Sequence, residues 1–123
     1  MNNDDGKKIM IIENDDMTLE ILKFILQKEG YKISVAKEGI TAIETIGSIM
    51  PDLVITDIMI PLKSGLEVID YIKKNHKQIP VIALSILGEE ERTVEQAFLL
   101  GVDDFITKPF NPKELLLRIK RFL

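Results

Sequence analysis

The stretch from Asp52 to Asp57, with the sequence DLVITD, constrains the fold of this chain more than any other. Its interior is apolar and rich in β-branched residues, and Pro51 and Pro61 limit its length, which is the pattern of a short strand buried on both faces. Such a strand belongs in the middle of a parallel sheet covered by helices. Asp57 then emerges at the carboxyl end of the strand, where open α/β sheets bind ligands. A lone aspartate there is also a common turn residue, so its chemistry depends on its neighbours.

Segments of strand type alternate with segments of helical spacing along the rest of the chain. Further strands are expected near residues 9–12, 33–36, 81–85 and 104–107. Helices are expected to begin after Asp15 or Asp16, after Gly39, after Gly65, at the run Gly88 to Glu91, and at Pro112. Parallel neighbours need crossover connections, so this order predicts an α/β three-layer sandwich with a five-stranded parallel sheet and five helices.

Composition excludes several classes of protein. The 123 residues are expected to form a single domain over 1–123, with a flexible polar tail at 1–6. The chain has no cysteine, which rules out disulfides, thiol nucleophiles and cysteine-bound zinc. Its net charge of −4 argues against direct binding of nucleic acid. We find neither a membrane-spanning run nor a signal sequence, so we expect a cytoplasmic protein without a membrane partner.

Polar residues follow four of the expected strands. Glu13-Asn14 follows the first strand, Asp57 ends the third, Ser85 ends the fourth, and Thr107-Lys108 ends the fifth. Because parallel strands end at the same edge of a sheet, these side chains should lie close together. Clustered carboxylates repel unless a cation lies between them, and a set of oxygen ligands suits Mg²⁺. With a metal ion and Lys108 beside it, Asp57 would be able to attack phosphorus, and Ser85 would be able to donate a hydrogen bond to the same group.

In these features the chain resembles the response-regulator receiver domain of two-component signalling, over residues 7–123. The resemblance depends on the order and spacing of several motifs rather than on any one of them. They are Glu13-Asn14, the segment 53–61 with Asp57, Gly65, Ser85, and the segment 101–110 with Phe105 and Lys108. The resemblance implies a flavodoxin-like doubly wound fold with the strand order 2-1-3-4-5.

The resemblance also implies a function for this edge of the sheet. Asp57 is expected to accept a phosphoryl group from a phosphohistidine of a sensor histidine kinase, and Lys108 is expected to contact the phosphoryl oxygens. The expected cofactor is Mg²⁺. Its expected ligands are Glu13, Asn14, Asp57 and the backbone carbonyl of Met59.

Ser85 and Phe105 match the switch pair of the family, in which the hydroxyl moves toward the phosphate and the aromatic ring turns inward. Taken alone, Ser85 is an ordinary strand-end residue and Phe105 an ordinary core residue. The output face would consist of the fourth helix, the fifth strand and the last helix, where a downstream output domain or protein would bind. The resemblance further implies a cis peptide bond between Lys108 and Pro109.

The same face is expected to support a homodimer, as in receivers attached to winged-helix transcription factors. Arg118 or Arg121 would then contact Asp103 or Asp104 of a second copy across a two-fold axis. Surface charge pairs often contribute little, so this expectation depends on where those side chains lie.

Two residues depart from the family pattern. Asn14 stands where a metal-binding aspartate is usual, so one negative charge is missing, and Asp15 is the next candidate to replace it. Ile86 stands where alanine or glycine is usual, and its branched side chain should crowd the mouth of the site. These departures leave open an interaction module that no longer takes phosphate. A flavin or nucleotide enzyme is disfavoured, because the acidic residues after the first strand would repel phosphate groups.

Overall fold

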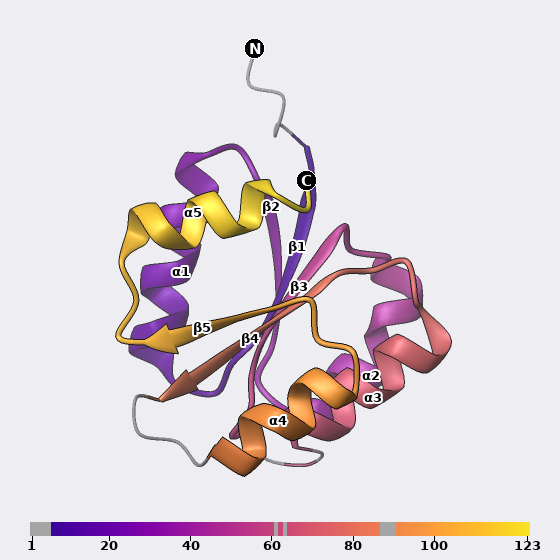
Figure 1. The fold of residues 1–123 in the computed structure, drawn as a ribbon. Coiled ribbons are helices and arrows are strands. Elements are labelled where there is room, and N and C mark those ends of the chain that lie inside the picture. Colours follow the sequence, from indigo (N-terminus) through magenta and orange to yellow (C-terminus); the bar gives the residue numbers. More distant parts are fainter. Residues whose placement is uncertain (1–5, 61, 63, 87–90) are drawn as a thin grey trace.

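The computed structural model describes residues 6–60, 62, 64–86 and 91–123, and shows a central sheet with helices on both faces (Figure 1). The strands are β1 (Lys8–Ile12), β2 (Lys32–Ala36), β3 (Leu53–Asp57), β4 (Val81–Ile86) and β5 (Asp104–Lys108). The helices are α1 (Asp16–Lys28), α2 (Gly39–Ile49), α3 (Gly65–Asn75), α4 (Glu91–Leu99) and α5 (Pro112–Lys120). Residues 1–5 of the tail expected at 1–6, and residues 88–90 of the helix start expected at Gly88 to Glu91, lie outside the described residues.

The sheet has the order β2-β1-β3-β4-β5, and every pair of neighbouring strands is parallel. The predicted α/β sandwich and its strand order are therefore confirmed. All five residues of β3 are buried, as expected for the central strand of a sheet covered on both faces. No helix in the described parts of the chain is long and apolar enough to cross a membrane.

Two apolar cores fill the space between the sheet and the helices. Helices α1 and α5 cover one face, whereas α2, α3 and α4 cover the other (Figure 1). Successive residues of a strand point to opposite faces, so each strand contributes alternate side chains to the two cores. In β3, for example, Leu53 and Ile55 pack beneath α1 and α5, whereas Val54 packs beneath the other helices.

The start of α1 follows from its capping residue. Asp15 has an extended backbone, and its side chain accepts a hydrogen bond from the backbone N–H of Thr18, as an N-cap does. Asp16 is then the first helical residue. The sequence alone did not decide which of these two aspartates is the N-cap of α1, and the structure shows that it is Asp15.

Gly65 allows the loop after β3 to return close to the strand. A β-carbon at this position would lie 2.3 Å from the carbonyl oxygen of Asp57 and 2.5 Å from the α-carbon of Ile58. The Gly65 backbone N–H also donates a hydrogen bond to the Ile58 carbonyl, at 2.9 Å. These neighbours are backbone atoms that cannot move away as a flexible side chain would, so only glycine fits here.

We therefore expect Gly65→Ala to destabilise the fold by about 2–4 kcal/mol, because the new methyl group would displace the backbone around Asp57. The matched control is Gly47→Ala in α2, where a β-carbon would meet no atom within 4 Å. That control should stabilise the protein by about 0.5–1 kcal/mol, since alanine favours a helix over glycine. Denaturant unfolding of both variants measures the difference, and equal stabilities would refute this account of Gly65.

Candidate functional site

The carboxyl ends of the strands border an open cleft of about 880 Å³. Its polar lining comes from the loop after β1, from the first turn of α1, from the end of β3 and from the end of β5. Apolar side chains from β4, α1 and the segment before α5 complete the rim. The lining residues are Glu13, Asn14, Asp15, Asp16, Thr18, Ile21, Asp57, Met59, Ile86, Lys108, Pro109, Phe110 and Pro112.

Strand alternation brings three charged side chains to the same face of the sheet. Ile11 in β1, Ile55 in β3 and Ile106 in β5 all pack in the core beneath α1 and α5. Two residues further along each strand direction come Glu13, Asp57 and Lys108, which therefore point to that same face. Of the side chains expected to converge, these three meet in the structure. Ser85, which was expected at the same rim, does not line the cleft.

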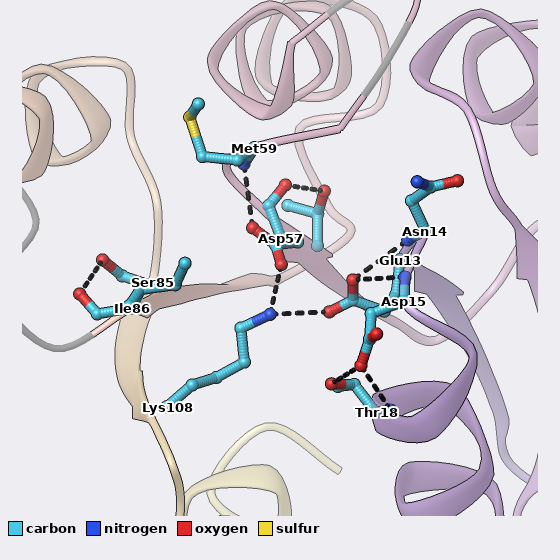
Figure 2. Close-up of polar contacts among 10 residues, drawn as sticks. Glu13, Asn14, Asp15, Thr18, Asp57, Met59, Ser85, Ile86 and Lys108 are labelled. Carbon is cyan, nitrogen blue, oxygen red and sulfur yellow. Dashed lines mark hydrogen bonds and ion pairs between the residues drawn. The ribbon is translucent and has the colours of Figure 1, made fainter.

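Lys108 lies between the two carboxylates (Figure 2). Its ammonium group forms an ion pair with Oδ2 of Asp57 and donates to Oε1 of Glu13 at 3.0 Å. Burial alone would lower the pKa of Lys108, but the bonds to Asp57 and Glu13 outweigh that effect and raise it. The residue is therefore a fixed positive charge at neutral pH. The peptide bond that follows it, Lys108–Pro109, is cis, as expected.

Glu13 is almost fully buried, with 2% of its surface exposed. Its Oε2 accepts hydrogen bonds from the backbone N–H groups of Asn14 and Asp15, each at 3.0 Å. Burial is the main cause that raises the pKa of Glu13, and the negative charge of Asp57 adds to it, while the hydrogen bonds from the Asp15 N–H and Lys108 act in the opposite direction. The carboxylate is thus held in one orientation, in a place where an added positive charge would stabilise its ionised form.

Asp57 is 4% exposed and is also held at both oxygens. Its Oδ1 accepts a hydrogen bond from the backbone N–H of Met59 at 2.8 Å, and its Oδ2 contacts Lys108. The Met59 side chain is exposed, so this residue contributes to the site through its backbone. The carboxylate faces the cleft, where a ligand would reach it.

Asn14 and Asp15 take different positions in the loop after β1. Asn14 is exposed, and its amide points away from the Lys108 ammonium (Figure 2). Asp15 holds the loop through Oδ2, which accepts from the Thr18 N–H at 2.9 Å and from the Thr18 hydroxyl at 2.7 Å. These two bonds lower the pKa of Asp15, and the charge of Lys108 lowers it further. The hydroxyl of Thr18 is a contact that sequence reasoning missed, although Thr three residues after a capping aspartate was a visible signal.

Ser85 and Ile86 point to opposite faces at the end of β4. Ile86 is 57% exposed and lines the cleft, as its predicted crowding of the mouth requires. Ser85 is buried and is not among the cleft-lining residues; its hydroxyl donates to the Ile86 carbonyl at 3.4 Å. Phe105 packs partly buried on the same side of the sheet as α3 and α4, where its ring stacks on Phe98 of α4 at 5.8 Å between centroids.

The charged residues expected to join two copies already have partners within the chain. Arg118 binds both carboxylate oxygens of Asp104, at 2.9 and 3.0 Å, and Arg121 lies 3.5 Å from the same group. Asp103 pairs with Lys73 at 2.5 Å. In a single copy these contacts therefore hold α5 to β5 and α3 to the start of β5, and a dimer of the expected kind would have to exchange them.

The donor set fits a divalent cation of the magnesium type. Glu13 and Asp57 present two carboxylates to the cleft, and Mg²⁺ binds few protein oxygens and keeps several waters. Within the described ranges there is no group of three or more His, Cys, Asp or Glu side chains placed to hold a metal ion. Any ion held here would thus take its remaining ligands from waters, backbone or amide oxygens.

Comparison with known proteins agrees with the fold. Residues 9–120 match the response regulator receiver domain family. The phosphate regulon transcriptional regulatory protein PhoB of Escherichia coli K12 is 36% identical over 117 residues, which cover 94% of this chain and 51% of that protein. The chain thus spans about half the length of the curated relatives it matches, 51% for PhoB.

Solved structures show the same relationship. The receiver domain of a signal transduction histidine kinase from Syntrophus aciditrophicus is 34% identical with a TM-score of 0.88, over 96% of this chain and 90% of that chain. The receiver domain of sensor histidine kinase PA1611 from Pseudomonas aeruginosa PAO1, at 23% identity and a TM-score of 0.87 over 95% of this chain and 97% of that chain, shares the fold. With its family match, parallel sheet and acidic cleft, the chain belongs to the response regulator receiver domains, the signalling modules of two-component systems.

Proposed function

We propose that Asp57 is the phosphoacceptor of this receiver domain and takes a phosphoryl group from the phosphohistidine of a sensor histidine kinase. The observation that carries the proposal is that the carboxylates of Asp57 and Glu13 both pair with the ammonium group of Lys108 in an open cleft. In the reaction an Asp57 oxygen forms a bond to phosphorus while the P–N bond to the donor imidazole breaks, and the electron pair of that bond leaves with the ring. Such transfer needs mainly positioning and positive charge around the transferring oxygens.

The contacts of Asp57 support a division of roles between its two oxygens. The Met59 N–H donates to Oδ1, so the loop after β3 fixes the orientation of the carboxylate. Lys108 contacts Oδ2 and also reaches Glu13, so its ammonium stays at the floor of the cleft. There it would stabilise negative charge on the phosphoryl oxygens.

We propose Mg²⁺ as the cofactor, with Glu13, Asp57, the Met59 carbonyl and Asn14 as candidate ligands. A bound Mg²⁺ would supply the positive charge that two buried carboxylates and a phosphoryl group require. Support comes from the pKa of Glu13, which burial raises and which a nearby cation would lower. The related fold of PA1611 is described with a magnesium ion coordinated in its active-site cleft.

We further propose that phosphorylation changes the face formed by α4, β5 and α5 through Ser85 and Phe105. The support is the stack of Phe105 on Phe98, which joins β5 to α4. That face would bind a downstream output domain or protein, or a second copy of the chain. The cytoplasmic location expected from the sequence stays a prediction.

A second candidate function is a receiver-like interaction module that does not take phosphate. Two observations favour it. Asn14 removes a charge that a metal ion would use, and Ile86 projects into the cleft mouth. The two functions are separated by a direct test of phosphorylation.

Incubation of the protein with Mg²⁺ and a small acyl phosphate should produce a phosphoryl adduct that intact-mass measurement detects. The adduct should be absent in Asp57→Ala, because the nucleophilic oxygen is gone, and retained in the control Asp70→Ala, which removes an exposed carboxylate on α3. An adduct that persists in Asp57→Ala would move the phosphoacceptor to another residue. A wild-type protein that forms no adduct would favour the interaction module.

The missing charge at Asn14 should weaken magnesium binding. Asn14→Asp is expected to bind Mg²⁺ roughly tenfold more tightly than the wild type, because a carboxylate replaces a neutral amide beside a divalent ion. Calorimetric titration of both proteins with MgCl₂ measures the ratio. Equal affinities would show that this position does not face the ion.

Ile86 should slow the entry of small molecules into the cleft. Ile86→Ala is expected to accelerate phosphorylation by a small acyl phosphate, or hydrolysis of the product, by up to about tenfold, since a steric barrier of about 1.4 kcal/mol changes a rate tenfold. The rates follow from the time course of the adduct in intact-mass spectra. The control Ile21→Ala removes an apolar side chain from the α1 side of the same cleft. Unchanged rates in Ile86→Ala would show that Ile86 does not limit entry to the cleft.

A further inference from the structure

The cleft lacks one negative charge at the position where the family usually has it. Asn14 is neutral and exposed, and its amide points away from the floor of the cleft (Figure 2). Glu13 and Asp57 already share one cation, Lys108, so the three side chains together present only one net negative charge to a divalent ion. Another carboxylate near this floor would restore the balance.

Asp15 has such a carboxylate, and only one of its two oxygens forms hydrogen bonds with residues that the structure describes. Both of its bonds to Thr18 use Oδ2. Its Oδ1 has no hydrogen-bond partner among the residues that the structure describes, and Figure 2 shows this oxygen on the side of the carboxylate away from Thr18. Asp15 lines the cleft and lies near enough to Lys108 for the two charges to interact.

We infer that Asp15 supplies the negative charge that Asn14 lacks, by accepting a hydrogen bond through Oδ1 from a water molecule of the bound Mg²⁺. This inference rests on the proposed magnesium-dependent function of the cleft. A role through water agrees with the spacing of the acidic side chains, since the described residues include no three that converge on one metal position. It also agrees with the coordination of Mg²⁺ in proteins, which usually retains several water ligands.

The N-cap makes this carboxylate suitable for the task. Two hydrogen bonds to Thr18 fix the Asp15 side chain at the start of α1, so its free oxygen needs no ordering when an ion binds. The backbone N–H of the same residue donates to Glu13 at 3.0 Å. Asp15 is therefore tied to the proposed metal ligand through its own backbone.

Asp16 offers a matched comparison. It lines the same cleft, but its carboxylate is paired with Lys37 at 2.7 Å and is largely exposed. The charge of Asp16 is already neutralised by a neighbour. Asp15 forms no ion pair with any residue that the structure describes, although its charge interacts with that of Lys108. The two adjacent aspartates should therefore affect magnesium binding differently.

The test is calorimetric titration of MgCl₂ into the wild type, Asp15→Asn and Asp16→Asn. Asparagine caps a helix as well as aspartate does, so Asp15→Asn should keep the thermal stability of the fold, which is measured in parallel. We expect Asp15→Asn to bind Mg²⁺ about threefold to tenfold more weakly, and Asp16→Asn to bind it as the wild type does. The loss in Asp15→Asn should shrink at high ionic strength, because the charge is exposed.

Equal affinities of Asp15→Asn and the wild type would overturn the inference, as would an equal loss in Asp16→Asn, which would indicate a general charge effect. If the wild type binds Mg²⁺ and forms the phosphoryl adduct while Asp15→Asn is unchanged, only the role of Asp15 fails. If the wild type binds no Mg²⁺, the proposed cofactor and this inference fail together.

Discussion

The ion pairs of Lys108 with two buried carboxylates are the interaction on which the cleft depends. Glu13 and Asp57 expose 2% and 4% of their surface, so each would pay a large desolvation cost if it carried an uncompensated charge. One ammonium group serves both, which leaves the three side chains with one unbalanced negative charge. The protein thus holds a cleft that is stable without a ligand and still attracts a cation. A buried ion pair is weak evidence for stability, but it holds these side chains in the defined arrangement that the proposed phosphoryl transfer would need.

The sheet supplies that arrangement without a dedicated scaffold. Glu13 and Lys108 meet although 95 residues separate them, because β1 and β5 end at the same edge and point those residues to the same face. Local backbone N–H groups then set the final orientation. The loop after β1 donates to Glu13 and the loop after β3 donates to Asp57, so each carboxylate is fixed by the turn that follows its own strand.

Features that follow from periodicity could be predicted from the sequence. The apolar runs located the strands, the capping and stop residues located the helices, and the shared edge of parallel strands brought Glu13, Asp57 and Lys108 together. The strand order came from the family resemblance, since pairing between distant segments is not encoded in any local pattern. The partners of Arg118 and Asp103 were not predictable, because a long charged side chain can reach a neighbour in its own chain or in another one. The role of Asp15 as cap likewise depended on its own backbone angles in the loop after β1.

The ends of β4 and β5 link the cleft to the opposite face of the sheet. Ile86 and Lys108 are register partners that face the cleft, whereas Ser85 and Thr107, the preceding pair, face the side covered by α3 and α4. Phe105 lies on that same side, two residues before Thr107, and stacks on Phe98 of α4. Because consecutive residues of a strand move together, a displacement of Lys108 toward a new anion in the cleft would shift the backbone that carries Phe105. Tightly packed interiors deform little, so such a shift would move the part of the structure that is packed least tightly. Helix α4 is such a part, because its residues Phe98 and Leu99 are exposed. In the proposed switch, these two adjacent strands would therefore transmit a change of charge in the cleft to the position of α4.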